Sequence, residues 1–549
     1  MDVDPQHKHE PRPGARAAVT APAAPAGMAV GGHPRRWAIL GVLVISLLVV
    51  VLDNTVLNVA LRTIADPVHG LGATQSDLEW SINSYTLVFA GLLFTAGVLG
   101  DRLGRKKVLL VGMVLFGLAS LASAYAQSPG QLIVARALMG VGGAAVMPAT
   151  LSIISNVFDP RERAKAIGTW AGAVGLGVAI GPVVGGLLLE HFWWGSVFLI
   201  NVPIVLIGIA AIVAMVPDSR DPRPGRIDLA GVLLSIAGLV LLVYGIIDGG
   251  DHGFGRATAW GSILGGLAVL VAFVLVERRV AFPSLEVALF RDPRFSAAVG
   301  AVGLVFFGAM GTLFFGSFYF QLVRGYSPLE SGLLMVPFAA AQLVFAPRSA
   351  AMVRRYGPKA VCAVGLGLVT LALAGYLLVD VHTPIWFVAV LFLVMGIGMA
   401  NVMPPATESI MSTLPREKAG VGSAVSNTIR QVGGALGVAV LGSLLSAVYR
   451  SRIGDSVAGL PGTARSAARE SISGTYAVAE RLGPRGAGLI DAGNHAFVQA
   501  MHWAAVGSVA VLFLGVAVVL GWLPRRSVVP APAPQPVESL AEQLELAEA

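Results

Sequence analysis

Apolar stretches of about twenty residues recur along most of this chain, and no other feature limits its possible folds so strongly. About 20 apolar residues in a helix cross the hydrocarbon core of a bilayer. Backbone polar groups find no water there, so a chain with many such stretches folds as a bundle of spanning helices. We therefore expect an all-α polytopic membrane protein with about fourteen transmembrane helices. The expected spans are 37–61, 80–100, 107–126, 131–154, 165–190, 197–216, 228–247, 258–277, 296–320, 330–352, 360–379, 385–408, 420–448 and 501–523.

Charged residues are scarce and unevenly placed. They make up 13% of the 549 residues, against 55% hydrophobic residues, whereas soluble domains carry about 25% charged residues. The net charge of +7 resides mostly in short loops on one side of the expected bundle. An excess of Lys and Arg marks cytoplasmic loops, so we predict that both termini are cytoplasmic and that no nucleic acid is bound. The basic loops contain Arg102, Arg105, Lys106, Lys107, Arg161, Arg163, Lys165, Arg220, Arg223, Arg226, Arg278, Arg279, Arg291, Arg294, Arg354, Arg355, Lys359, Arg416 and Lys418.

Two terminal segments and one long loop lie outside the expected spans. Residues 1–36 are rich in Ala, Pro, Gly, His and Arg, and we expect a disordered cytoplasmic tail. Residues 524–549 are expected to form a second cytoplasmic tail. The long loop 449–500 is expected to be external, with short helices around 464–482. The chain has one cysteine, so an intramolecular disulfide and a cysteine-based metal site are excluded.

Two charged residues fall inside expected spans. Asp53 lies in the first span and Arg136 in the fourth. A charge near the bilayer centre costs about 2.5–3.5 kcal/mol, so such residues usually face a cavity or a partner and do work there. The first span leaves the cytoplasm and the fourth returns to it, which places both residues in the outer half of the bilayer. We predict that they share a hydrogen-bond network in which proton uptake by Asp53 releases Arg136. A static structural ion pair is the alternative reading.

The fifth span is rich in glycine between Gly168 and Gly186. Glycines three or four residues apart make a smooth strip on which another helix can pack closely. A proline inside the helix removes one backbone hydrogen bond and allows a bend. Such a helix suits a protein whose two halves rock against each other, although ordinary small-residue packing gives similar patterns. The fixed positions of this motif are Gly168, Gly177, Gly181, Pro182, Gly185 and Gly186.

The loop between the second and third spans carries another spaced motif. Its glycines allow close contact and a tight turn, and its aspartate can pair with an arginine or with a helix N-terminus. These properties suit a latch between neighbouring segments. The motif consists of Gly97, Asp101, Arg102, Gly104 and Arg105. A degenerate echo at 347–359 lacks the aspartate and indicates two related halves.

Together these motifs resemble those of the major facilitator superfamily, in particular its fourteen-helix drug:proton antiporters, typified by quaternary-ammonium and other multidrug exporters. Segments 198–203, 326–332 and 404–437 are also similar to that subfamily. The resemblance implies a major facilitator fold with two six-helix bundles, 37–216 and 296–523, and two linker helices within 217–295. It further implies that Asp53 and Arg136 take part in proton coupling and that the Gly168–Gly186 motif marks an exporter. It also implies that the loop after the second span is a gate latch, which holds the cytoplasmic gate shut against the helix that begins near Ala419.

The resemblance also points to a substrate region and to departures from the family pattern. We expect a cavity between the bundles, lined by side chains such as Trp80, Tyr85 and Trp170. Many relatives have an aspartate where Asn83 stands, and its loss removes a candidate proton carrier or cation contact. Arg62 replaces a usual proline. Two further charges, Glu408 and Arg430, lie in the second half. Glu408 is equally well explained as a solvated acid at a helix end.

We therefore expect proton-coupled efflux of hydrophobic small molecules, such as drugs or antibiotics, across a bacterial cytoplasmic membrane. The expected partners are the substrate, protons and the lipid bilayer, with no cofactor, no metal and a monomeric state. Proton-coupled uptake is the first alternative, and the complete Gly–Pro motif argues against it. A non-transporting ligand sensor is the second, and it has no need of a proton cycle. No nucleotide loop or nucleophile triad indicates an enzyme.

Overall fold

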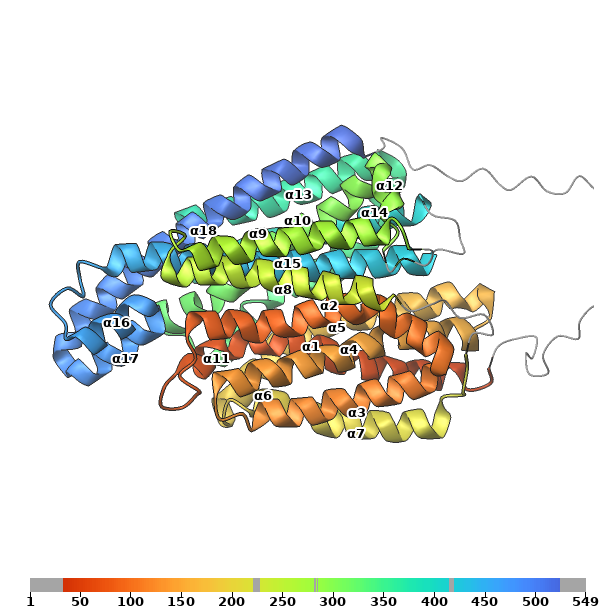
Figure 1. Cartoon of the computed structure of the whole chain (residues 1–549), viewed down its shortest axis with the longest axis horizontal. Helices are drawn as coiled ribbons and strands as arrows, with labels where there is room; N and C mark the ends of the chain where they lie inside the picture. Colours follow the sequence, from red (N-terminus) through yellow and green to blue (C-terminus); the bar gives the residue numbers. More distant parts are fainter. Residues whose placement is uncertain (1–32, 221–227, 281–282, 284, 414–418, 524–549) are drawn as a thin grey trace, which may run out of the picture.

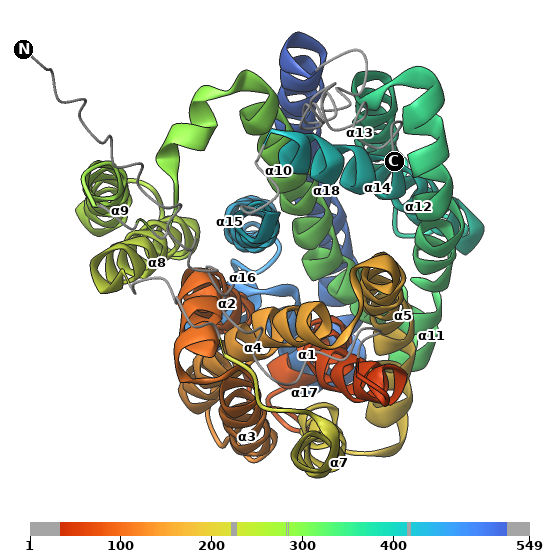
Figure 2. The same cartoon turned by 90° about the vertical axis from the view of Figure 1, so that its right-hand side faces the viewer.

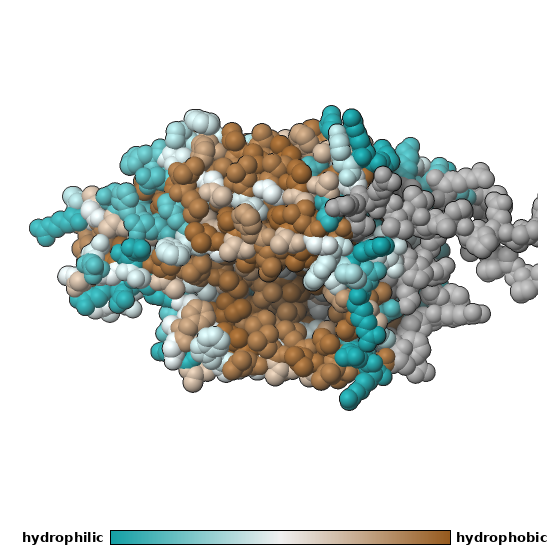
Figure 3. Space-filling model, turned by 90° about the horizontal axis from the view of Figure 1, so that it is seen from above, coloured by the Kyte–Doolittle hydropathy of each residue, from teal (hydrophilic) through white to brown (hydrophobic). Residues whose placement is uncertain are grey.

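The fold is that of a computed structural model, which describes residues 33–220, 228–280, 283, 285–413 and 419–523. Within these residues every regular element is helical, and most helices run along one long axis (Figure 1). Figure 3 shows a broad band of hydrophobic surface around the middle of the molecule, with hydrophilic residues toward its two ends. The predicted tails lie largely outside the described residues, as do the loop residues 221–227 and 414–418.

The first half of the chain forms α1 to α7. Their bounds are α1 Arg36–Ala65, α2 Gln75–Leu103, α3 Arg105–Ala124, α4 Pro129–Val157, α5 Pro160–His191, α6 Ser196–Leu199 and α7 Asn201–Met215. The sixth expected span is therefore divided, because the helix is interrupted at Ile200. Two linker helices follow, α8 Leu229–His252 and α9 Ala257–Glu277.

The second half forms the remaining elements. Their bounds are η1 Val287–Arg291, α10 Pro293–Phe318, η2 Tyr319–Val323, α11 Pro328–Leu333, α12 Val336–Tyr356, α13 Pro358–Gly375, η3 Tyr376–Leu378, α14 Ile385–Ser412, α15 Ala419–Ile453, α16 Gly462–Glu470, α17 Ile472–Leu482, η5 Gly483–Gly486 and α18 Ala487–Trp522. The predicted short helices around 464–482 are confirmed as α16 and α17, and their external location stays a prediction. The predicted loop 449–500 was too long, because α15 continues to Ile453 and α18 already begins at Ala487.

Thirteen of the fourteen predicted spans are confirmed, because thirteen helical segments of the described residues are long and apolar enough to cross a bilayer. At the remaining expected span, 165–190, the structure has α5, in which residues 176–191 form a shorter apolar stretch. We call the end of the bundle at which α1 begins and α18 finishes the terminal end, and the opposite end, which carries α16 and α17, the far end (Figure 1).

Local sequence explains where several helices begin. Thr74 and Asp77 form a reciprocal capping box at the start of α2, and Ser327 and Glu330 form another at the start of α11. The turns α2–α3 and α12–α13 each contain a glycine with positive φ, Gly104 at 110° and Gly357 at 82°. These matched turns fit the motif and its echo at 347–359.

The two halves face each other, with the linker pair beside them. Figure 2, seen from the terminal end, shows α1–α7 grouped together, most of α10–α18 opposite, and α8 and α9 beside α2 and α15. At the far end, Ser317 of α10 donates a hydrogen bond to the carbonyl oxygen of Asn58 in α1. Gln321 Nε2 donates to the carbonyl oxygen of Val59 at 2.8 Å. These contacts close the far end between the halves.

Candidate functional site

Asp53 of α1 and Arg136 of α4 form an ion pair inside the first half. Arg136 Nη1 donates to Asp53 Oδ2, and the two residues are 2% and 1% exposed. The contact that the sequence predicted from their depth is present. A buried pair of this kind needs further hydrogen bonds to offset the loss of water from both ions.

Arg136 is held by groups on several sides. Its Nε donates to the carbonyl oxygen of Ser81 in α2 at 3.1 Å. Its guanidinium carbon lies 4.4 Å from the centre of the Tyr85 ring and 5.9 Å from that of Phe198. A desolvated guanidinium over an aromatic ring gains about 2 kcal/mol. The arginine therefore has favourable contacts besides its bond to Asp53.

Asp53 has a second donor that the sequence analysis missed. Asn201 Nδ2 lies 3.3 Å from Asp53 Oδ1 and 3.0 Å from Ser120 Oγ. Ser120 Oγ in turn donates to the carbonyl oxygen of Phe198 at 2.8 Å. The interruption at Ile200 places Asn201 in the first position of α7, where its side chain reaches the carboxylate. Its position in the family-like segment 198–203 was the available signal.

Tyr85 completes the network. Its hydroxyl accepts a hydrogen bond from Asn54 Nδ2 at 3.0 Å, and its ring stacks on Phe89 with 5.7 Å between centres. Tyr85 is 0% exposed and packs against Gly140 of α4. The ring therefore faces Arg136 in this structure, and its predicted place in a substrate cavity stays a prediction.

The other predicted cavity residues also have different surroundings. Trp80 lies beside Tyr244 of linker helix α8, with 6.5 Å between ring centres. The Trp170 indole donates to Thr150 Oγ1 of α4 at 3.2 Å, and only 9% of the residue is exposed. These contacts show which helices the two rings face in this structure, and their place in a substrate cavity stays a prediction.

Three further predicted residues remain apart from the ion pair. Asn83 is 0% exposed, and neither side-chain amide atom has a hydrogen-bond partner within the described part of the chain. Arg430 of α15 is half-buried, with its guanidinium carbon 5.6 Å from the centre of the Phe306 ring. Glu408 is exposed near the end of α14. Their roles in transport stay predictions.

The loop motif is compact at the terminal end. Asp101 Oδ1 lies 3.0 Å from Arg105 Nε and 2.9 Å from its Nη2, so the aspartate pairs within its own motif. Gly104 forms the turn, and Gly97 faces Pro148 of α4. Arg102 is exposed. Residues 414–418, which precede the expected partner helix, lie outside the described residues, so the latch stays a prediction.

The glycines of α5 lie against α1, the helix that carries Asp53. A β-carbon at Gly177 would lie 2.8 Å from Val51 Cγ1, one at Gly181 would lie 2.8 Å from Thr55 Cβ, and one at Gly185 would lie 2.9 Å from Val56 Cγ1. Gly186 instead meets Leu329 of α11, across the two halves. Among the described residues, no atom lies within 4 Å of the β-carbon position of Gly168. The motif thus packs α5 onto α1 and onto the second half.

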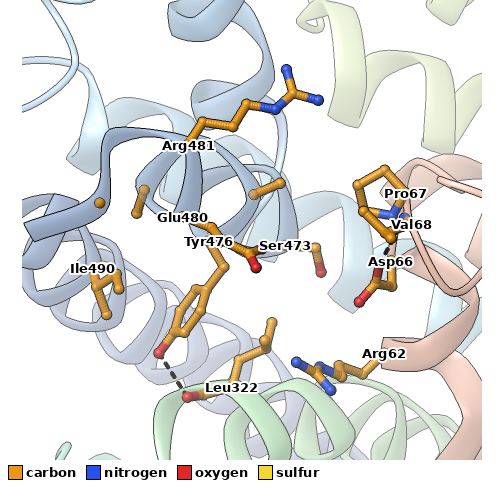
Figure 4. Close-up of a pocket in the computed structure, with 13 residues that line it drawn as sticks. Arg62, Asp66, Pro67, Val68, Leu322, Ser473, Tyr476, Glu480, Arg481 and Ile490 are labelled. Carbon is orange, nitrogen blue, oxygen red and sulfur yellow. Dashed lines mark hydrogen bonds between the residues drawn. The ribbon is translucent and has the colours of Figure 1, made fainter.

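A separate pocket of about 570 Å³ lies at the far end, between the end of α1 and the short helix α17. Figure 4 shows Arg62 and Asp66 on one wall and Tyr476, Glu480 and Arg481 on the other. Tyr476 also anchors α17 to the second half, because its hydroxyl donates to the carbonyl oxygen of Leu322 at 2.7 Å. Arg62, which stands where the family pattern usually has proline, therefore faces this far-end pocket.

Comparison with known proteins agrees with this architecture. The family model described as Major Facilitator Superfamily matches residues 43–438. The chain belongs to the Major Facilitator Superfamily.

Among its relatives, the multidrug efflux pump LfrA of Mycolicibacterium smegmatis is 37% identical over 494 residues, which cover 90% of this chain and 97% of that one. The tetracenomycin C resistance and export protein of Streptomyces glaucescens is 34% identical, with 90% and 92% covered. The methyl viologen resistance protein SmvA of Salmonella typhimurium is 34% identical, with 88% and 97% covered.

Solved structures of the superfamily show the same fold. A bacterial homologue of the human lysosomal transporter Spinster, in an inward-facing and unoccupied conformation, has a TM-score of 0.63 and 18% identity. The match covers 91% of this chain and 100% of that one. The inward-facing and occupied structure of the same protein has a TM-score of 0.65 and 17% identity.

Proposed function

We propose that this superfamily member exports hydrophobic small molecules from the cytoplasm in exchange for protons. The observation that carries the proposal is the buried Asp53–Arg136 pair, held against the Gly–Pro helix α5 through α1. The relatives that are named for multidrug efflux, tetracenomycin C export and methyl viologen resistance support an export function. The terminal end faces the cytoplasm in this proposal, because the basic loops lie there.

The mechanism follows from the contacts of the pair. Asp53 accepts hydrogen bonds from Arg136 and Asn201, which suits the ionised carboxylate. A proton on Asp53 neutralises the carboxylate and weakens its attraction for the guanidinium. Arg136 then keeps the Ser81 carbonyl and the Tyr85 ring as partners. The changed pairing alters the position of α1 and, through the glycine contacts, that of α5.

In this proposal α5 carries the change to the other half of the molecule. Its glycines fit closely on α1, and its far end meets α11. Packed helices with small residues at their contacts tend to move as rigid units rather than deform. Proton binding at Asp53 therefore biases the opening of the far end against the opening of the terminal end. The chain works as a monomer in the cytoplasmic membrane.

The energetics favour neutral or monovalent lipophilic substrates. A membrane potential of about 100 mV supplies about 2.3 kcal/mol per charge, and one pH unit supplies about 1.4 kcal/mol. A neutral molecule exchanged for one proton uses both and reaches a gradient of several hundredfold. A monovalent cation uses only the pH term. Asn83 adds no second charge to the first half.

The deciding experiment is proton movement in inverted vesicles with an acidic interior. Addition of a transported lipophilic drug should make the lumen more alkaline in the wild type, and Asp53→Asn should abolish this change. Glu190→Gln, which removes an exposed carboxylate at the far end of α5, is the matched control and should behave as the wild type. Drug-dependent acidification would indicate uptake, and saturable drug binding without proton flux would indicate a sensor. Either result would overturn the proposal.

A further inference from the structure

A second buried carboxyl group lies on α2, away from the Asp53 network. Glu79 is 1% exposed and sits one turn into the helix, at the far end. Its Oε2 has no hydrogen-bond partner within the described part of the chain. An unpartnered carboxylate in a low-dielectric interior is costly, and a protonated carboxyl is much less so. A proton on the carboxyl group would remove this cost.

Glu79 marks a contact between the two halves. A β-carbon at Gly442 of α15 would lie 2.7 Å from the Glu79 carboxyl carbon, so the absence of a side chain at Gly442 makes room for the acid. Glu79 belongs to the first half and Gly442 to the second. When α15 moves away from α2, the carboxyl group faces the external solution. When the two helices meet, it is sealed.

Gln75, one turn earlier in α2, offers Glu79 a side-chain hydrogen bond, and the charged groups nearby give it little further compensation. Arg450 of α15 is the nearby cation, but its Nη1 lies 3.7 Å from Asp251 of α8, with which it pairs. The other ionisable groups of this region are His252 on α8, Asp77 on α2 and Glu470 on α16. Burial, and then the charges of Asp251 and Asp77, raise the pKa of Glu470, which reflects the local excess of negative charge.

The linker helix α8 reinforces this contact. Ser443 Oγ donates to the carbonyl oxygen of Ile246 at 3.1 Å, which ties α8 to α15 next to Gly442. The Asp251–Arg450 pair adds a second tie nearer the far end. Because α8 also packs on α2, three units of the molecule meet at Glu79. Closure of the far end therefore buries this carboxyl group on every side.

We propose that Glu79 is a gating proton site, which must take a proton from the external solution before the far end can close. The proton binds Glu79 Oε2 while the far end is open and returns to external water when it reopens. Glu79 thus controls closure without adding to the net proton transfer. The proposal rests on the proposed function, since it assumes alternating opening of the two ends.

The test measures far-end opening directly. In a Cys362→Ala background, Ser317→Cys places a thiol at the closed interface, where Ser317 is 2% exposed. A membrane-impermeant maleimide is added outside right-side-out vesicles at external pH 5.5 to 8.5. Labelling is divided by that of Gly459→Cys, an exposed far-end position, to remove the intrinsic pH dependence of the thiol. The linked open fraction changes at most about tenfold per pH unit.

With Glu79 present, the normalised labelling should fall about tenfold or more from high to low external pH. Glu79→Gln should label slowly at every pH, because it resembles the protonated acid. Glu79→Asp should keep the response and shift its midpoint, which separates titration from misfolding. Asp251→Asn should keep the pH response but label faster overall, because it removes the tie to Arg450 and leaves Glu79 in place. A pH response that survives in Glu79→Gln, or disappears only in Asp251→Asn, would overturn the inference.

The two proposals fail separately. If no lipophilic drug causes proton flux with the wild type, proton antiport is refuted. An unchanged gate response in Glu79→Gln, with normal flux that still depends on Asp53, refutes only the role of Glu79. If the normalised labelling does not change with external pH when Glu79 is present, the role of Glu79 is refuted as well.

Discussion

Gly332, near the end of α11, lies directly against the backbone of Pro182 in α5. A β-carbon on Gly332 would lie 2.7 Å from the Pro182 carbonyl carbon. Four residues further along α5, Gly186 faces Leu329 in the same short helix. The Gly–Pro segment therefore forms part of the closed contact between the two halves, in addition to its packing on α1.

This contact predicts the effect of adding one methyl group at Gly332. Gly332→Ala should destabilise the closed far end by about 1–3 kcal/mol, because the backbone of α5 cannot yield as a flexible side chain would. Far-end labelling of Ser317→Cys should rise about tenfold, and drug export should fall. Gly168→Ala is the control, since no atom of the described part of the chain lies within 4 Å of its β-carbon position. That variant should retain export and gain up to about 1 kcal/mol of helix stability.

Asn201 should matter for proton coupling more than an ordinary buried amide. Asn201→Ala removes the second donor to Asp53 and should cost about 1.5–3 kcal/mol of stability, as expected for a hydrogen bond to a charged group. It should also shift the pH dependence of drug-driven proton flux. Asn401→Ala is the matched control, because Asn401 Nδ2 bonds only the carbonyl oxygen of Ile397, in its own helix. An unchanged flux profile in Asn201→Ala would contradict a positioning role.

Much of the architecture follows from the sequence because the bilayer imposes it. The length of each apolar run sets the helix, and the order of the runs sets the depth of any charge within them. This is why the contact between Asp53 and Arg136 was predictable from two residues on separate helices. The short helices α16 and α17 were also predictable, since their stretches form helices without being apolar enough to span.

The faces of the helices were harder to predict, because lipid and protein interior are similarly apolar. Hydrophobic periodicity therefore marks the buried face of a membrane helix only weakly. Trp80 was expected in a cavity and lies against α8, and Tyr85 was expected there and serves Arg136. Glu79 stands at the edge of a span, where a charge looks like an ordinary interfacial residue. Only the approach of Gly442 shows that it is buried.

The loop motif should separate activity from stability. Asp101→Asn removes a pair with Arg105 that is partly exposed, at 31% and 17% of the two side chains. Such pairs contribute about 0–1 kcal/mol, so the unfolding temperature in detergent should change little. Export should nevertheless fall strongly if Asp101 engages another helix in the opposite conformation. Lys107→Gln, an exposed charge change in the same region, should affect neither quantity. Full export by Asp101→Asn would exclude the latch.

Asp66 lies on the wall of the far-end pocket. It should make the stability of its own loop decrease at acid pH. Burial opposes ionisation, but the backbone N–H groups of His69 and Val68 outweigh it and hold the pKa of Asp66 below its usual range. Because the unfolded value is about 3.9, the ionised carboxylate stabilises the loop fully above that pH. The stabilisation is lost as the pH falls through the lower folded pKa.

Hydrogen exchange of residues 66–72 between pH 2 and 6, corrected for intrinsic exchange rates, measures this effect. The wild type should lose protection only at the acid end. Asp66→Ala should be less protected throughout the neutral range and should show no acid step, since both N–H groups have lost their acceptor. Asp455→Ala, an exposed acid of the same end, should retain the wild-type profile. Equal protection in the wild type and Asp66→Ala at pH 6 would show that the carboxylate does not hold this loop.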